Sequence, residues 1–161
     1  MPRRASAGLL PYRTREGALE VLIAHMGGPF WARKDAGAWS VIKGEHEPEE
    51  DALGAARREW AEETSTTPPN GEYVELGEVR QKSGKRVSAW AVEAPELDPS
   101  AFVCNTFEME WPPRSGRVQQ FPEIDRAEWM AIEPARTRLV EGQRPLLDAL
   151  LAAVGMPPAT A

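Results

Sequence analysis

The sequence contains very little cysteine and histidine. There is one cysteine, Cys104, and there are two histidines, His25 and His46, in 161 residues. A single cysteine excludes an intrachain disulfide and an all-cysteine metal site, and we expect Cys104 to be a small buried hydrophobe. Neither histidine has a second His or Cys at metal-ligand spacing, so we expect both to be structural or to face solvent.

Long hydrophobic runs and an excess of positive charge are also missing. No segment approaches the roughly 20 apolar residues that a membrane-spanning helix needs. Residues 1–17 contain no apolar run long enough for a signal peptide, so we expect a cytoplasmic protein with no membrane partner. The formal net charge of -6 argues against nucleic acid as a partner. A phosphorylated small molecule is not excluded, because a bound metal ion can reverse the sign of the local field.

What the sequence does contain is typical of one globular domain. Its length, with 42% hydrophobic and 27% charged residues, is sufficient for a hydrophobic core. Short apolar runs bounded by turn residues predict strands, and two longer segments predict helices. The predicted strands are 6–13, 18–26, 38–42, 73–79, 86–94, 101–111 and 127–132, and the predicted helices are 48–64 and 133–154, the second interrupted near 142–145. This order predicts an α+β fold with a central mixed β-sheet, in a single domain over 1–161 whose residues 155–161 form a flexible tail.

The segment from Lys43 to Thr66 is unusually acidic, with eight carboxylates and two adjacent arginines. On a helix over 48–64, three of these carboxylates share one side with three alanines, and the stripe is Ala52, Ala55, Ala56, Glu59, Glu62 and Glu63. Alanines let a helix lie close to a sheet, so the acidic half of the stripe is predicted to face the protein body. Carboxylates there repel one another, and Arg58 cannot neutralise all three, but Mg²⁺ can. A salt-bridged surface helix is the alternative.

The same segment resembles the Nudix box, the signature of the Nudix family. A glycine, a glutamate, an Arg-Glu pair and a Glu-Glu pair stand at the family's spacing, and the matching residues are Gly44, Glu50, Arg58, Glu59, Glu62 and Glu63. The order of strands and helices along the chain agrees with the family. Ser65 and Thr66 stand where relatives usually have a glycine and an aliphatic residue, and Trp60 replaces an aliphatic residue. The missing glycine leaves the geometry of the helix end open, because glycine there supplies a left-handed cap.

The resemblance implies a Nudix fold, an α/β/α sandwich, and hydrolysis of a nucleoside diphosphate linked to another moiety. The metal site that it implies for Mg²⁺ or Mn²⁺ consists of Glu59, Glu62, Glu63, the main-chain carbonyl of Lys43, and Gly44, which allows close approach. Bound metal would screen the pyrophosphate chain, polarise its oxygens and lower the pKa of the attacking water. Glu62 and Glu63 are therefore catalytic candidates. Arg58 and Glu50 are candidates too, with Glu50 either orienting Arg58 or acting through water.

A glutamate outside the box is also implied by the resemblance. Many relatives have one shortly before a Trp-containing strand, where it acts as base or extra ligand. Glu123 stands six residues before Trp129 and is our candidate. Glu108 and Glu110 are the reserve candidates, and an ordinary loop carboxylate is the alternative for Glu123.

Candidates for substrate binding come from the run before the box. The run from Trp39 to Gly44 resembles a Trp-x-x-Pro-Lys-Gly segment that is common among dinucleoside polyphosphate hydrolases, with Ile42 in place of proline. The candidates are Trp39 and Lys43 in this run, and Lys85 in a later basic patch. Ordinary surface charge is the alternative for each lysine.

The resemblance therefore implies a Mg²⁺-dependent hydrolase of a nucleoside or dinucleoside polyphosphate. The alternative is a non-catalytic, nucleotide-binding Nudix-like sensor, although such domains usually lose one or more box carboxylates and this chain keeps all of them. An enzyme of the isopentenyl diphosphate isomerase type needs a catalytic cysteine and metal-binding histidines, and the low Cys and His content disfavours it. The resemblance also allows a homodimer, since homodimers are frequent in the family.

Overall fold

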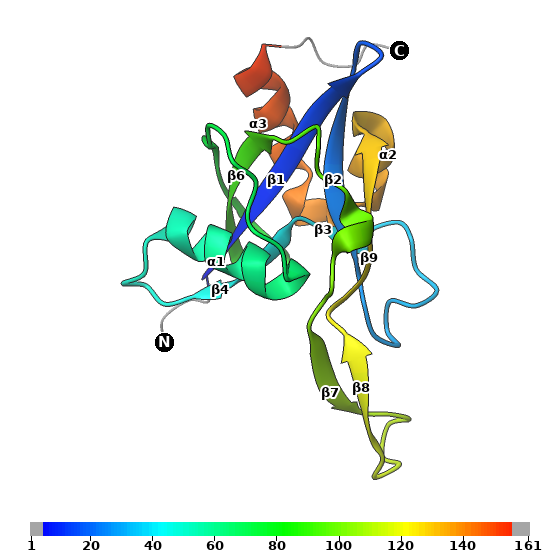
Figure 1. Cartoon of the computed structure of the whole chain (residues 1–161). Coiled ribbons are helices and arrows are strands. Elements are labelled where there is room, and N and C mark those ends of the chain that lie inside the picture. The colour runs from blue at the N-terminus through cyan, green and yellow to red at the C-terminus, as the bar shows by residue number, and fades with distance from the viewer. Residues whose placement is uncertain (1–4, 156–161) are drawn as a thin grey trace.

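The computed structural model describes residues 5–155 and contains one large mixed sheet (Figure 1). Its strands are β1 (Ala5–Arg15), β2 (Ala18–Met26), β3 (Trp39–Ser40), β4 (Ile42–His46), β5 (Val74–Arg80), β6 (Arg86–Glu93) and β9 (Ile124–Ala131). Strand β1 is central, because it pairs in parallel with β6 and antiparallel with β2 and β4. Strand β9 pairs with β2. The predicted central mixed sheet is therefore confirmed.

Helices cover both faces of this sheet. The helices are α1 (Ala52–Thr64), α2 (Ile132–Arg138) and α3 (Pro145–Val154), and the 3₁₀ turns are η1 (Pro99–Ala101) and η2 (Glu141–Gln143). Successive side chains of a strand point to opposite faces, so Leu9 and Leu22 pack on the side of α1, while Leu10 and Val21 pack on the side of α2 and α3. The predicted α/β/α sandwich and the break in the C-terminal helix are both confirmed.

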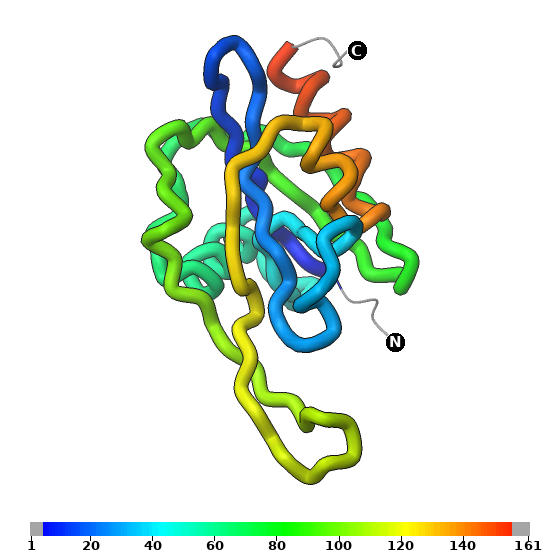
Figure 2. The backbone as a smooth tube through the Cα atoms, turned by 90° about the vertical axis from the view of Figure 1, so that its right-hand side faces the viewer, coloured from blue at the N-terminus to red at the C-terminus, as the bar shows by residue number. Residues whose placement is uncertain are grey.

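A two-stranded hairpin projects from the body of the molecule (Figures 1 and 2). It consists of β7 (Thr106–Glu110) and β8 (Val118–Pro122), which form a separate antiparallel sheet. The sequence predicted one longer strand over 101–111 and an irregular segment after it, so β8 was missed. The reason is its sequence, VQQFP, which lacks alternation and ends in proline.

Helix α1 begins at Ala52, later than the predicted start at Pro48. The Asp51 carboxylate caps the helix, because it accepts a hydrogen bond from the Gly54 N–H at 2.9 Å. This cap satisfies one of the free donors of the first turn and leaves Pro48 in the preceding turn.

The other end of α1 is regular although the family's glycine is missing. Ser65 takes the left-handed conformation that glycine would supply, with φ 58° and ψ 26°. Its N–H donates to the Ala61 carbonyl at 2.9 Å, and its hydroxyl donates to the Val103 carbonyl at 2.8 Å. These two hydrogen bonds stabilise an otherwise unfavourable backbone conformation for serine.

The predicted strand over 38–42 is two short strands in the structure. Because β3 pairs with β2 and β4 pairs with β1, the chain changes partner at Val41. The Val41 N–H donates to the side-chain Oε1 of Gln143 at 2.9 Å. The change of partner carries Lys43 and Gly44 onto the edge of β1 that lies under α1.

Three further expectations concern membranes, the chain end and Cys104. Within residues 5–155, no helix is long and apolar enough to cross a bilayer. The predicted tail at 155–161 lies outside the described residues, except for Gly155. Cys104 is partly buried, and burial raises the pKa of its thiol.

Candidate active site

Helix α1 places Glu59 directly against β4. Ala55 and Ala56 are fully buried, and their small side chains let the helix lie close to the sheet. Glu59 is itself buried, with 8% of its surface exposed. A Cβ atom on Gly44 would lie 1.9 Å from Oε2 of Glu59, so only glycine leaves room for this carboxylate.

Arg58 joins three carboxylates of the box. Its Nε and Nη2 donate to the two oxygens of Glu50 at 2.8 and 3.0 Å, which makes a bidentate pair. Its Nη1 donates to Oε1 of Glu59 at 2.8 Å and to Oε2 of Glu62 at 3.2 Å. The hydrogen bonds from Arg58 hold the pKa of Glu50 below its usual value. Glu50 lies off the alanine stripe but is linked to it through Arg58.

Glu63 and Glu123 line one pocket, although they come from distant parts of the chain. The pKa of Glu63 is raised to about 7, first by burial and then by the charges of Glu123, Glu59 and Glu62. A hydrogen bond with the Asn105 side chain lowers it. Burial likewise raises the pKa of Glu59. The four carboxylates thus form one electrostatically coupled group.

The pocket beside Glu63 has a volume of about 160 Å³ and is lined by residues of β2, β3, β4, α1 and β9. Its polar side chains are Ser40, Lys43, Glu63 and Glu123. The pKa of Lys43 is lowered to about 8, first by burial and then by the charge of Lys85. Pockets that enclose a whole small molecule measure about 300–1,000 Å³. This pocket can therefore take only one part of a nucleotide.

The structure brings most of the predicted site residues together. Those around the box and the pocket are Lys43, Gly44, Glu50, Arg58, Glu59, Glu62, Glu63 and Glu123. Trp39 lies in the core instead, 1% exposed, and its Nε1 donates to Asp35 at 2.9 Å. Lys85 lies at the edge of the group, where it pairs with a glutamate at 3.4 Å. Glu108 and Glu110 are exposed on β7 and do not line the pocket.

Two residues beside the pocket were not singled out from the sequence. Asn105 bonds to the Glu63 side chain, and its main-chain carbonyl accepts from the Glu123 N–H at 2.8 Å. No local pattern marks Asn105, because its neighbours in space are distant along the chain. Ser40 lines the pocket and stands three residues before Lys43 in the run that precedes the box. Its position in that run could have marked it as a candidate pocket residue.

The box carboxylates suit a hard divalent cation by their chemistry. They are oxygen donors, which Mg²⁺ prefers, and their mutual repulsion favours a nearby cation. As the side chains stand within residues 5–155, no three His, Cys, Asp or Glu residues are arranged to hold a metal ion. In this arrangement the Arg58 guanidinium binds oxygens of both Glu59 and Glu62.

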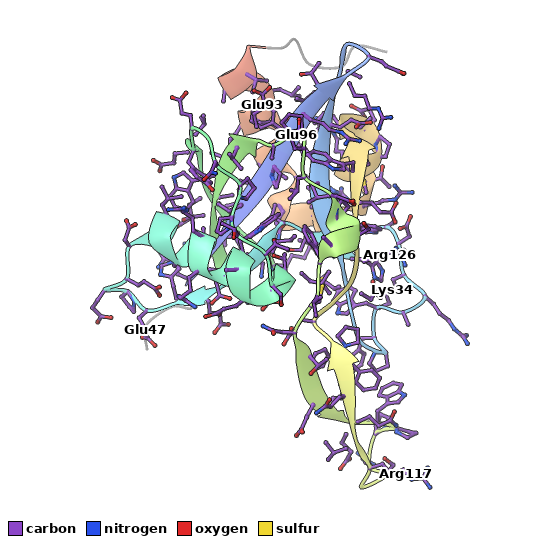
Figure 3. All side chains as sticks on the ribbon, in the orientation of Figure 1. Lys34, Glu47, Glu93, Glu96, Arg117 and Arg126 are labelled. Atoms are coloured by element: carbon purple, nitrogen blue, oxygen red, sulfur yellow. The ribbon has the colours of Figure 1, made fainter. Side chains whose placement is uncertain are left out.

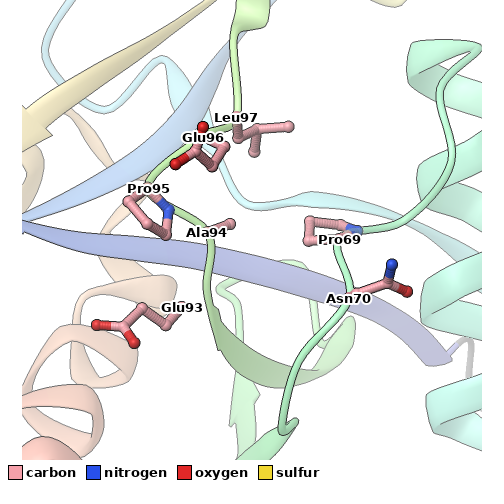
Figure 4. A pocket seen from close by; sticks show the side chains of 7 residues that line it. All are labelled: Pro69, Asn70, Glu93, Ala94, Pro95, Glu96 and Leu97. Carbon is pink, nitrogen blue, oxygen red and sulfur yellow. The ribbon is translucent and has the colours of Figure 1, made fainter.

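A larger cavity, of about 400 Å³, lies where the loop before β5 meets the segment after β6 (Figure 4). Pro69 and Leu97 contribute apolar walls, and Glu93 and Glu96 contribute two carboxylates. No lysine or arginine is among its lining residues. Two acidic groups without a basic one disfavour a polyphosphate ligand, so the pocket at Lys43 is the better candidate site.

Comparisons with known proteins agree with this geometry. The family model described as NUDIX domain matches residues 2–150. No curated protein matches the chain.

Solved structures share the fold at low sequence identity. A C. elegans Ap4A hydrolase binary complex is 23% identical with a TM-score of 0.62, over 94% of this chain and 98% of that chain. The NUDIX domain of Shewanella oneidensis NrtR, complexed with ADP ribose, is 12% identical with a TM-score of 0.62, over 96% and 90%. RenU, a Nudix hydrolase from M. smegmatis, is 20% identical with a TM-score of 0.58, over 99% and 90%.

Proposed function

Because the chain belongs to the Nudix family, we propose that it hydrolyses a pyrophosphate bond in a nucleoside or dinucleoside polyphosphate, with Mg²⁺ or Mn²⁺ as cofactor. Family membership and the solved Nudix hydrolases of the same fold support a hydrolase that acts on phosphorus anhydrides. The observation that carries the proposal is the cluster of four coupled carboxylates, Glu59, Glu62, Glu63 and Glu123, beside the Lys43 pocket.

The box residues are the ones that would hold the metal. Glu59, Glu62 and Glu63, with the main-chain carbonyl of Lys43, would bind Mg²⁺ or Mn²⁺, which would screen the phosphate chain and lower the pKa of the attacking water. In the chain itself, Arg58 orients Glu59 and Glu62 by the hydrogen bonds from its Nη1.

Two pocket residues are placed to act on the substrate. The Lys43 ammonium can bind a phosphoryl oxygen, because it lines the pocket together with Glu63 and Glu123. The Glu123 carboxylate can accept the proton of a water molecule that attacks phosphorus. Glu50 acts at a distance, because it fixes Arg58 by a bidentate pair.

The size of the pocket supports phosphate recognition. A volume of about 160 Å³ admits a part of the phosphate chain but not a whole nucleotide. In this proposal the nucleoside stays outside the pocket, and Lys85, whose charge acts on Lys43, contributes further positive charge. The likeness to the C. elegans Ap4A hydrolase supports dinucleoside polyphosphates as one substrate class to test.

A substrate panel with box variants tests the proposal. We expect the wild-type chain to hydrolyse nucleoside triphosphates or diadenosine polyphosphates, with products identified by mass, and to lose turnover on addition of EDTA. Glu62→Gln and Glu63→Gln should each lower kcat by more than about 100-fold while the fold is kept, because each removes an anionic ligand. Glu49→Gln, in the exposed turn before α1, is the matched control. Full turnover in both box variants with Mg²⁺ present would sink the proposal.

A nucleotide-binding sensor is the second candidate, and one observation favours it. The Arg58 guanidinium already binds oxygens of Glu59 and Glu62, as it would in a domain that needs no metal. This reading expects nucleotide binding in calorimetry without turnover on any substrate of the panel, and binding that survives EDTA.

A further inference from the structure

His25 is fully buried near the end of β2, and both of its ring nitrogens have close partners. Nδ1 lies 2.8 Å from Oδ1 of Asp125, and Nε2 lies 2.6 Å from the main-chain carbonyl oxygen of Lys34. The Trp39 ring packs edge-on against the imidazole, with 5.4 Å between the ring centroids. The imidazole is therefore held between two polar contacts and one aromatic contact.

Both polar partners of the imidazole are hydrogen-bond acceptors. A main-chain carbonyl has no proton to give, and an ionised carboxylate accepts only. A neutral imidazole carries one N–H, so it would satisfy one partner and turn a lone pair toward the other, at 2.6 or 2.8 Å. An imidazolium donates from both nitrogens, and the Asp125 carboxylate compensates its charge. The geometry thus fits a protonated His25 paired with Asp125.

Asp125 is the extra residue of a β-bulge in β9. The register between β2 and β9 shifts at Met26, so that Arg126 and Ile124 have partners on β2 while Asp125 between them has none. Bulges beside functional sites re-aim neighbouring side chains. This bulge follows Glu123, whose side chain lines the pocket.

The same imidazole fixes the loop that joins β2 to β3. The loop starts at Gly27, whose N–H donates to the Glu123 carbonyl at 3.0 Å, and it is tied again at the Lys34 carbonyl. A Cβ on Gly27 would lie 1.9 Å from the Pro122 carbonyl oxygen, so the loop packs tightly against the residue before Glu123. Figure 3 marks Lys34 on the loop and Arg126 on β9, the two segments that the imidazole joins.

We propose that His25 is a positioning residue for Glu123. As an imidazolium between Asp125 and the Lys34 carbonyl, it pins the bulge of β9 to the loop after β2, and this fixes the direction from which Glu123 enters the pocket. The effect on turnover rests on the proposed function. The ion pair between His25 and Asp125 is independent of the proposed function.

The ionic state of His25 is tested by nitrogen-15 NMR of the full, tag-free chain without substrate or metal. The chain has two histidines, so a His46→Gln variant assigns the spectrum. At neutral pH an ordinary exposed imidazole is mostly neutral, whereas we expect both ring nitrogens of His25 to be protonated. A His25 ring with one unprotonated nitrogen overturns the proposal.

Two substitutions of Asp125 distinguish loss of the contact with His25 from loss of the carboxylate charge. In Asp125→Asn the amide can donate to Nδ1 of a neutral ring, whose Nε2 still donates to Lys34, so we expect one unprotonated nitrogen and a kcat within about twofold of wild type. In Asp125→Ala the partner is lost, and we expect kcat to fall about tenfold with KM within about twofold, because Lys43 stays in place. Glu128→Ala removes an exposed carboxylate from the same strand and is the matched control.

The outcomes distinguish the two proposals. Loss of kcat in the alanine variant, with rescue in the asparagine variant, supports the positioning role. Equal kcat in the alanine variant and wild type overturns it, as do equal losses in both variants, since the carboxylate would then act by itself. If the wild-type chain hydrolyses nothing on the substrate panel, the proposed function fails. The NMR spectrum alone then supports or overturns the ion pair between His25 and Asp125.

Discussion

Gly44 is the residue with the least room for a side chain beside the box carboxylates. A Cβ there would lie 1.9 Å from Oε2 of Glu59, so Gly44→Ala must displace that carboxylate or the strand. We expect turnover to fall at least about tenfold, and overpacking to lower the free energy of unfolding by about 1–3 kcal/mol. Steady-state kinetics and urea unfolding measure the two effects.

Gly54→Ala is the control for this substitution. The nearest atom to its Cβ would be Oδ2 of Asp51 at 3.2 Å, the oxygen that caps α1 by accepting from the Gly54 N–H, so this cap would have to shift by a few tenths of an ångström. Alanine is the better helix former by up to about 1 kcal/mol, which offsets the shift of the cap, so this variant should stay within about 1 kcal/mol of wild-type stability with unchanged turnover. Wild-type turnover in Gly44→Ala would show that Glu59 does not need its observed place.

Asp35 gives a prediction for the pH dependence of stability. Its carboxylate accepts from Trp39 Nε1 at 2.9 Å and from Arg138 Nε at 3.0 Å, and these hydrogen bonds lower its pKa. A carboxylate whose pKa is lower in the folded state stabilises above the unfolded pKa, and the stabilisation is lost as pH falls through the folded pKa. Asp35→Asn should therefore lower the free energy of unfolding at neutral pH by less than about 1 kcal/mol, because the pair is exposed. Urea unfolding should show this difference shrinking as pH falls through the lowered pKa of Asp35 in the folded state, and a difference that stays constant with pH would contradict the assignment.

The sequence was informative about some site residues and misleading about others. The helical period predicted that Glu59, Glu62 and Glu63 face the protein body with the alanines. Glu59 is buried with Ala55 and Ala56, whereas Glu62, at the outer edge of the stripe, is exposed. Trp39 looked like a substrate contact, because the run around it resembles a family segment, yet it lies in the core. Neighbouring residues of a strand point to opposite faces, and spacing alone did not show that Ser40 rather than Trp39 faces the pocket.

At the scale of elements, Gln143 of η2 holds the point where the chain passes from β3 to β4. Its side chain is fully buried, accepts from the Val41 N–H at 2.9 Å, and donates to Ser40 Oγ and Gln81 Oε1 at 3.0 Å each. Gln143→Leu leaves the Val41 N–H without this acceptor. We expect the free energy of unfolding to fall by about 1–3 kcal/mol, the cost of an unsatisfied buried group. Gln120→Leu, at an exposed position of β8, is the control for adding an apolar side chain, and equal stability of both variants would contradict this role.

Elements with a clear hydrophobic period could be predicted from the sequence, and elements set by their partners could not. The strands β1 and β2 and the helix α1 have patterns that agree with their burial. The division of 38–42 into two strands depends on which neighbour each half meets, which no local pattern records. Strand β8 forms because β7 lies opposite it, although its own residues lack a strand pattern.

At the scale of the whole molecule, the pocket exists because the sheet joins distant segments. The box contributes Lys43 and Glu63 from neighbouring elements, and their proximity follows from the sequence motif. Glu123 lies beside the pocket because β9, which follows it, pairs with β2 rather than with a sequence neighbour. A motif that spans two dozen residues cannot specify that pairing, and this is why the downstream glutamate could be nominated only through the family resemblance.

The projecting hairpin should be the least stable part of the fold. Two-stranded sheets are marginally stable on their own, and β7–β8 contacts the loop after β2 through Phe30 and Trp111, whose ring centroids are 5.8 Å apart. Val118 on β8 is 64% exposed, whereas β1 lies between neighbours on both sides and has a fully buried core face. Amide hydrogen exchange should therefore be faster in 106–110 and 118–122 than in β1 and β6, because local opening there breaks few contacts. Mass spectrometry of the exchanging chain measures this order at several protein concentrations. Hairpin amides as slow as those of β1 would contradict the expectation, and protection that grows with concentration would place the hairpin in a homodimer interface.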